Sequence, residues 1–327
     1  MKTYLSGIQP TGLPHLGNYF GAIRRHIEAA KAEGEHFYFI ADYHALTTSR
    51  DPEGLRNQVR EVALTYLSCG LDPERAVLFR QSDVPEVTEI AWLLSTVTGM
   101  GLLERAHSYK DKTAKGIKPN VGLFTYPILM AADILAYDSD VVPVGKDQVQ
   151  HVEMAQDMAG YFNGAYGEVF VRPEYELAEE EHLAKVVGID GDKMSKSYGN
   201  DIWIFESGKK LKKRFGKITT DSRGPEEPKD PAEVLPLRFL DLFLSQETLA
   251  PLYETVRKGG EGAPGYGDLK MQAFEAMEAY FAPARARREE LLSDPAELDR
   301  LLAANAEVAR ARAATVRDRA IAACGLR

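Results

Sequence analysis

Short apolar runs alternate with helical patterns through roughly the first two hundred residues. Four of these runs predict buried strands: residues 3–8, 35–41, 76–79 and 141–144. Apolar residues that recur at helical spacing predict helices at three places: residues 19–32, 52–70 and 148–162. Strands that alternate with helices predict a doubly wound parallel sheet, which is the Rossmann-like α/β class.

The pattern changes in the last third of the chain. A basic stretch at 209–214 and a charged, proline-rich stretch at 225–231 are followed by helical patterns alone. Long helices are expected at 272–292 and 295–324, where alanine, leucine, glutamate and arginine dominate. We therefore expect two domains, one α/β and one all-helical with a last helix that can pack back onto the first: residues 1–203 and 204–327.

Composition narrows the possible settings. The 327 residues are 44% hydrophobic, which is enough for a large core, and no apolar run is long enough to span a membrane. No signal peptide precedes the first strand, and Cys69 and Cys324 lack metal-site or disulfide spacing, so we expect a reduced, cytoplasmic protein. The net charge of −9 argues mildly against general nucleic-acid binding but leaves room for local basic faces that bind RNA.

A glycine-rich turn at residues 9–18 joins the first predicted strand to the first predicted helix. This is the position at which an open parallel sheet binds nucleotides. Gly12 and Gly17 allow the backbone to approach a ligand closely, and the helix N-terminus favours negative charge. His15 can donate a hydrogen bond to a phosphate, although a lone histidine is equally well a structural residue.

The segment Lys193-Met194-Ser195-Lys196-Ser197 carries two ammonium groups on a predicted loop. Such a loop suits a polyphosphate whose negative charge grows during reaction. For an isolated lysine pair, a solvated basic loop would be the better interpretation. The glycine-rich turn elsewhere in the same domain favours the phosphate-binding interpretation.

These motifs resemble those of the class I aminoacyl-tRNA synthetases, and nearly the whole chain resembles the bacterial tryptophanyl branch. The resemblance rests on six strings: residues 6–12, 15–18, 130–135, 142–148, 193–197 and 220–222. Residues 193–197 match the family's KMSKS loop, and residues 15–18 resemble its HIGH motif with Asn18 in the last position. The chain also has Tyr43 and Lys146 where the family often has glutamine and glutamate.

The resemblance implies that ATP activates an amino acid, pyrophosphate leaves, and the aminoacyl group passes to the 3′ end of a tRNA. It also implies Mg²⁺ carried by ATP, with no protein metal site. The implied catalytic residues are Gln9, Lys112, Lys193 and Lys196. The implied ATP contacts are Gln9, Thr11, His15, Gly17, Asn18, Gly145, Asp147, Lys193, Met194, Ser195 and Lys196.

Selection of tryptophan requires a buried acceptor, because the indole N–H only donates. Asp133 lies in a strongly apolar predicted helix, which favours this role over that of a surface or helix-end carboxylate. An acceptor rejects phenylalanine, whereas tyrosine must be rejected by shape. The other residues expected at the tryptophan site are Leu5, Gly7, His44, Tyr126, Met130, Val142, Val144 and Gln148.

Partners and alternatives complete the hypothesis. The apolar helical segment 85–107 is typical of core, but the resemblance implies that an insertion at 85–120 forms a homodimer interface. The helical domain is expected to bind the tRNA anticodon. Its arginines, which can contact RNA or form surface ion pairs, are Arg285, Arg287, Arg288, Arg310, Arg312, Arg317 and Arg319. A tyrosine-specific ligase and a non-catalytic nucleotide- or RNA-binding paralogue remain the competing functions.

Overall fold

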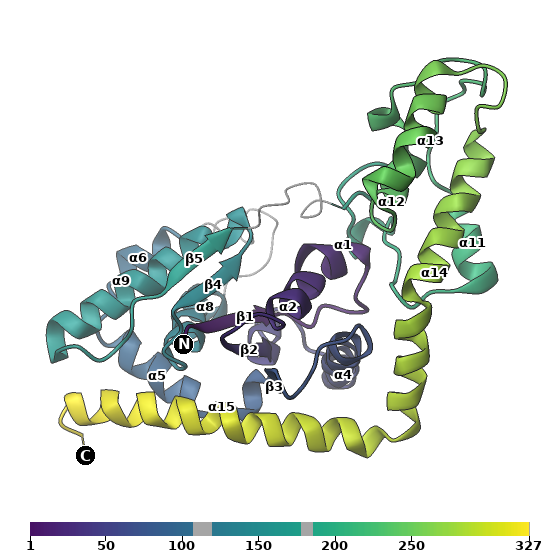
Figure 1. The fold of residues 1–327 in the computed structure, drawn as a ribbon. Coiled ribbons are helices and arrows are strands. Elements are labelled where there is room, and N and C mark those ends of the chain that lie inside the picture. The colour runs from purple at the N-terminus through teal and green to yellow at the C-terminus, as the bar shows by residue number, and fades with distance from the viewer. Residues whose placement is uncertain (107–119, 178–185, 327) are drawn as a thin grey trace.

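A five-stranded parallel sheet forms the centre of the N-terminal part of the protein (Figure 1). The computed structural model describes residues 1–106, 120–177 and 186–326. The strands lie in the order β3-β2-β1-β4-β5, with every neighbouring pair parallel. Their bounds are β1 Thr3–Ile8, β2 Glu35–Ile40, β3 Ala76–Arg80, β4 Val141–Val144 and β5 Glu174–Leu177. The predicted doubly wound sheet is therefore confirmed, and its strand order reverses between β1 and β4.

The edge strand β5 was not predicted from the sequence. All four of its residues are exposed, and Glu174 and Glu176 alternate with Tyr175 and Leu177. A strand with no buried residue leaves no apolar run in the sequence, so the pattern that identified the other four strands is absent here.

Both faces of the sheet are buried at β2, where successive residues pack on opposite sides. Tyr38 and Ile40 join the apolar cluster that includes α2 and α4. Phe37 and Phe39 join the cluster that includes α5, α8 and α9. The helices of this part, with a π-helical turn η1 inside the first predicted helix, are α1 Leu16–Asn18, η1 Tyr19–Ile23, α2 Arg24–Ala29, α3 Asp42–Ala45, α4 Pro52–Ser68, α5 Glu86–Ser95, α6 Met100–Glu104, α8 Val121–Leu135 and α9 Val149–Tyr166.

The segment predicted as one long helix at 85–107 forms two helices, α5 and α6. Between them, the hydroxyls of Thr96 and Thr98 bond to the backbone carbonyls of Leu93 and Leu94. These bonds compete with continued helix, and Gly99 then serves as the N-cap of α6. The single-helix prediction was wrong because apolar spacing does not register this local competition.

The C-terminal part is all helical, as predicted for the residues that follow the proline-rich stretch at 225–231. Its elements are α11 Gly208–Gly216, α12 Leu235–Leu240, α13 Gln246–Lys258, α14 Tyr266–Ser293 and α15 Pro295–Ala323. The chain turns sharply after α14 (Figure 1), where the Asp294 side chain caps α15 by accepting from the N–H groups of Ala296 and Glu297. Within the described ranges, no helix is long and apolar enough to cross a lipid bilayer.

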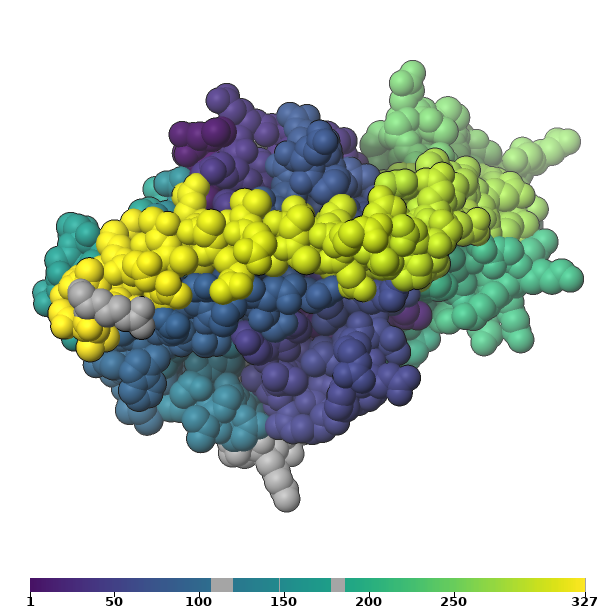
Figure 2. Space-filling view, turned by 90° about the horizontal axis from the view of Figure 1, so that it is seen from below, coloured from purple at the N-terminus to yellow at the C-terminus, as the bar shows by residue number. Residues whose placement is uncertain are grey.

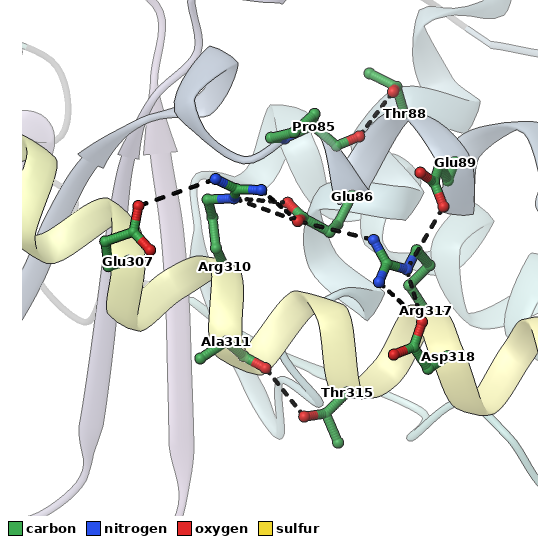
Figure 3. A network of polar contacts seen from close by, with 10 residues as sticks. All are labelled: Pro85, Glu86, Thr88, Glu89, Glu307, Arg310, Ala311, Thr315, Arg317 and Asp318. Atoms are coloured by element: carbon green, nitrogen blue, oxygen red, sulfur yellow. Dashed lines mark hydrogen bonds and ion pairs between the residues drawn. The ribbon is translucent and has the colours of Figure 1, made fainter.

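Helix α15 returns along the α/β part and crosses its underside as a continuous band (Figure 2). Its small apolar face, which includes Ala309, Ala313 and Val316, is buried in the same cluster as α5 and α8. Figure 3 shows Arg310 and Arg317 of α15 converging on Glu86, a buried residue at the start of α5. Apolar packing and ion pairs to the buried Glu86 together hold the last helix against the sheet domain.

The seven arginines considered for RNA binding all pair with carboxylates. Each has a carboxylate oxygen within 4.0 Å, on Glu278, Glu290, Glu61, Glu86, Glu35, Asp318 or Asp138. The ion-pair alternative is therefore confirmed for these arginines.

Candidate active site

A cavity of about 490 Å³ opens at the carboxyl ends of the strands, where the strand order reverses. Gln9 follows β1, His44 follows β2, and Gly145 and Gln148 follow β4, and all four line this cavity. Parallel strands present their carboxyl ends at the same edge of a sheet, so residues that directly follow such strands come to lie near one another. The structure brings them together there.

The wall of the cavity is mostly apolar. The residues expected at a tryptophan site that line it are Leu5, Gly7, His44, Tyr126, Met130, Val142, Val144 and Gln148. Gly7 is required by close packing, because a Cβ at that position would lie 2.4 Å from Cζ of Phe39. An apolar space with a few polar groups suits a flat, largely hydrophobic ligand.

Asp133 lies in the last turn of α8 and is only 1% exposed. Its Oδ2 is 2.8 Å from His44 Nε2, and Gln81 Nε2 donates to Oδ1 at 2.8 Å and to Oδ2 at 2.9 Å. Burial raises the pKa of the Asp133 carboxyl, while the hydrogen bonds from His44 and Gln81 act in the opposite direction. The surface-carboxylate alternative is wrong. Asp133 adjoins the cavity through His44 and through Met130 and Ile134, which line it.

A second polar chain crosses the cavity wall from α8 to α9. The Tyr126 hydroxyl lies 2.7 Å from His151 Nε2, and His151 Nδ1 lies 2.9 Å from Gln148 Oε1. Burial raises the pKa of Tyr126 to about 12, so its hydroxyl keeps its proton at neutral pH. Sequence reasoning missed His151, although its position three residues after Gln148 placed both on one face of the helix.

The glycine-rich turn is fixed by a reciprocal cap. His15 Nδ1 accepts from the Asn18 N–H at 3.3 Å, and Asn18 Oδ1 accepts from the His15 N–H at 3.1 Å. A Cβ on Gly17 would lie 2.9 Å from His15 Cε1, so this position requires glycine. Asn18 therefore stabilises the turn, because its side-chain oxygen accepts the hydrogen bond from the His15 backbone N–H.

The loop at 193–197 rests on a buried asparagine. Asn200 accepts from the Ser195 N–H at 2.8 Å and donates to Asp190 and to the carbonyl of Lys193. The Lys196 ammonium donates to the carbonyl of Thr11 at 2.7 Å, in the glycine-rich turn. Two motifs that are 185 residues apart in sequence thus meet in the folded chain.

Burial and charge set the protonation of this junction. The pKa of His15 falls to about 4 because of burial first and the nearby Lys196 charge second. The pKa of Lys196 falls to about 8 because of burial, and Asp201 opposes that shift. At pH 7 His15 is therefore neutral and Lys196 is mostly charged. The junction presents a cation beside a turn that favours anions.

For two of the expected site residues the structure does not describe the side chain. Lys112 lies outside the described residues, as does the side chain of Asp147. Among the described residues, no group of three or more His, Cys, Asp or Glu side chains is placed to hold a metal ion.

Comparison with known proteins identifies the family. The family model of class I tRNA synthetases for tryptophan and tyrosine, "tRNA synthetases class I (W and Y)", matches residues 1–282. The chain belongs to this family. A relative from Rhodopirellula baltica named tryptophan–tRNA ligase is 54% identical over 323 residues, which cover 99% of each chain.

Solved structures of synthetases agree over the full length. Tryptophanyl-tRNA synthetase from Campylobacter jejuni, complexed with ADP and tryptophan, superposes with a TM-score of 0.91 at 48% identity and covers 99% of this chain and 100% of its own. The enzyme from Mycoplasma pneumoniae has a TM-score of 0.80 at 30% identity and covers 100% of this chain and 98% of its own. The α/β part and the helical part of this synthetase thus match solved synthetases as one arrangement.

Proposed function

We propose that this synthetase is a tryptophan–tRNA ligase. It activates L-tryptophan with ATP to give tryptophanyl-adenylate and pyrophosphate, and then transfers the tryptophanyl group to the 3′ end of its tRNA. The observation that carries the proposal is Asp133, a fully buried carboxylate beside an apolar cavity at the switch point of the sheet. The full-length similarity to relatives named tryptophan–tRNA ligase supports the same conclusion.

The amino-acid side chain occupies the apolar cavity in this proposal. The indole N–H donates to Asp133, and Leu5, Met130 and Val142 contact the ring. Phenylalanine offers no donor and leaves the carboxylate without that bond, which disfavours it strongly. Tyrosine offers a donor at a different distance from its backbone, so the shape of the wall must exclude it.

Adenylate formation needs positioning and charge stabilisation more than a protein nucleophile. The tryptophan carboxylate attacks the α-phosphorus, and the bond to the pyrophosphate oxygen breaks. Lys193 and Lys196 stabilise the charge that develops on the leaving pyrophosphate, with Ser195 and Lys112 as further contacts. Residues of the turn, Gln9, Thr11 and His15, contact phosphates.

The remaining nucleotide contacts follow from neighbouring positions. Gly17 and Asn18 border the adenosine, Met194 packs beneath the loop, and Gly145, Asp147 and Gln148 lie near the ribose and the amino-acid ammonium. Mg²⁺ enters bound to the ATP phosphates and supplies further neutralisation of their charge when bound.

The helical part, residues 204–327, binds the tRNA anticodon in this proposal. Two copies associate through the surface of α5, α6 and the start of α8. Trp92, Met100 and Val121, which lie on these elements, are 71%, 62% and 78% exposed, so large apolar side chains face solvent there. The proposal places the enzyme in the cytoplasm as a homodimer.

Aminoacylation of tRNA tests the proposal. Radiolabelled tryptophan should become attached to bulk bacterial tRNA in the presence of ATP and Mg²⁺, whereas tyrosine should not. Asp133→Leu should lower kcat/KM for tryptophan by about 1.5–3 kcal/mol, roughly 10- to 150-fold, with a much smaller effect on the KM for ATP. Asp133→Asn is the comparison variant, because it keeps the size of the side chain and one acceptor oxygen while removing the negative charge. Charging with tyrosine in preference to tryptophan would refute the proposal.

A further inference from the structure

Gln81 is a buried polar residue to which the proposed function assigns no role. It directly follows β3 and is 1% exposed. Its Nε2 donates to both oxygens of Asp133, at 2.8 and 2.9 Å, and its Oε1 accepts from the Tyr43 N–H at 3.1 Å. A carboxylate on one side and a backbone donor on the other fix which end of the amide faces Asp133.

We infer that Gln81 is a positioning residue for amino-acid selection, which holds the Asp133 carboxylate ionised and oriented to accept one donor from the substrate. This inference rests on the proposed role of Asp133 as the acceptor for the indole N–H. Gln81 does not touch the substrate itself, since it acts through the carboxylate.

The hydrogen bonds around Asp133 leave room for one more donor. A carboxylate offers about four acceptor positions. Among the described residues, Oδ2 is bonded by His44 and Gln81, and Oδ1 by Gln81 alone. The remaining position on Oδ1 matches the single N–H of an indole. Gln81 thus occupies acceptor positions that would otherwise take up water or a proton.

The backbone around Gln81 is fixed from both sides, as a positioning role requires. Asn305 of α15 donates to the carbonyl of Leu78 at 3.2 Å in β3. Ser82 donates its N–H to Asp42 Oδ1 at 3.0 Å, and Glu86 pairs with Arg310 of α15 (Figure 3). The Gln81 amide is therefore presented from a rigid segment.

Burial alone would favour the protonated form of Asp133, because desolvation is the largest influence on its pKa and raises it. The hydrogen bonds of His44 and Gln81 counter this influence. Without the Gln81 donor the carboxyl takes up a proton more readily. A protonated carboxyl is itself a donor, and its remaining acceptor capacity is weaker.

Two variants separate this role from simple packing. Gln81→Leu keeps the approximate volume and removes the amide. Gln81→Glu keeps the shape and the acceptor for the Tyr43 N–H. When the introduced carboxyl and Asp133 share one proton, the pair carries the same single negative charge as the wild-type amide with Asp133. Gln246→Leu is the matched control, because Gln246 also donates to an aspartate, Asp241, but lies in the helical part at an exposed position.

The test is pyrophosphate exchange with tryptophan and with 3-benzothienylalanine, in which sulfur replaces the indole N–H. Wild-type enzyme should prefer tryptophan by about tenfold or more, the value of a hydrogen bond to a charged group. Gln81→Leu should reduce that preference at least about fivefold through the KM for tryptophan, with the KM for ATP unchanged. In Gln81→Glu the preference should rise as the pH falls, because one shared proton restores the donor.

The outcomes distinguish the inference from the proposal beneath it. If wild-type enzyme does not distinguish the two substrates, the role of Asp133 as acceptor is wrong. If wild-type enzyme and Gln81→Leu distinguish them equally, only the inference about Gln81 is overturned. Should Gln81→Leu fail to fold, judged by its thermal unfolding, Gln81→Glu decides alone. A preference in that variant that does not rise on acidification contradicts the inference.

Discussion

Replacing Lys196 with alanine tests whether the loop at 193–197 acts together with the glycine-rich turn at 9–18 on the phosphates of ATP. The Lys196 ammonium donates to the Thr11 carbonyl at 2.7 Å, in the glycine-rich turn. It therefore lies beside the proposed phosphate contacts. The variant removes one positive charge from this place and leaves the cavity for the amino acid intact, since Lys196 does not line it.

The expected effect is large and selective. Losing one preorganised donor to a developing charge costs about 10²–10³ in rate, or roughly 2.7–4 kcal/mol. A Coulomb estimate agrees, because two unit charges about 4 Å apart interact by roughly 4 kcal/mol at an effective dielectric constant near 20. Single-turnover adenylation should slow by that factor, while tryptophan binding without ATP changes by less than about twofold. Lys210→Ala is the control, because Lys210 is exposed and pairs with Glu206.

The pH dependence gives an independent measure. With a pKa of about 8, Lys196 loses its charge as pH rises through that value, so kcat/KM for ATP should fall on the alkaline side. In Lys196→Arg this alkaline fall should disappear, since the guanidinium stays charged. Near-normal adenylation by Lys196→Ala, or an alkaline fall that persists in Lys196→Arg, would refute the reasoning.

Three further predictions concern assembly and stability. In sedimentation at micromolar concentration the wild-type protein should have twice the chain mass of 36.3 kDa, and Trp92→Glu should have the mass of one chain. A wild-type protein that is monomeric and fully active would count against the interface. Burial lowers the pKa of His26 to about 3, so the unfolded chain binds more protons at this residue than the folded chain between about pH 6.5 and about pH 3. Lowering the pH from about 7 to about 5.5 should therefore remove about 1 kcal/mol of unfolding free energy through His26, and urea titrations of His26→Phe should show a loss smaller by that amount, with the contribution of His15 retained. Glu86→Leu should lower unfolding free energy by about 1–3 kcal/mol, because Arg310 and Arg317 lose a buried partner; an unchanged thermal midpoint would argue that apolar packing alone holds α15.

The sequence predicted those parts of the fold in which burial is continuous along the chain. β2 illustrates this, because five of its six residues are buried, and Phe37, Tyr38, Phe39 and Ile40 among them are apolar or aromatic. The exposed edge strand β5 and the break between α5 and α6 were not predicted. In both places the local backbone is decided by neighbouring strands or by threonine hydroxyls, which periodicity does not record.

Residues of the candidate site could be predicted where they directly follow a strand. They were harder to predict where their hydrogen-bond partners lie far away in the sequence. Gln81 had an available signal, since it directly follows a strand as Gln9 does. Its two contacts, with residues 38 and 52 positions away, could not be read from spacing. Likewise, Arg310 of α15 forms an ion pair with Glu86, 224 residues earlier, and this pairing is visible only in the folded chain.

Pyrophosphate exchange with each of the twenty amino acids tests the central claim most directly. Purified wild-type protein, ATP, Mg²⁺ and labelled pyrophosphate suffice, so neither tRNA nor a partner protein limits the result. The account predicts exchange that depends on tryptophan, with tyrosine and phenylalanine weaker by about two orders of magnitude or more because they cannot satisfy both Asp133 and the apolar wall. Exchange that depends on tyrosine, or none with any amino acid, would contradict it.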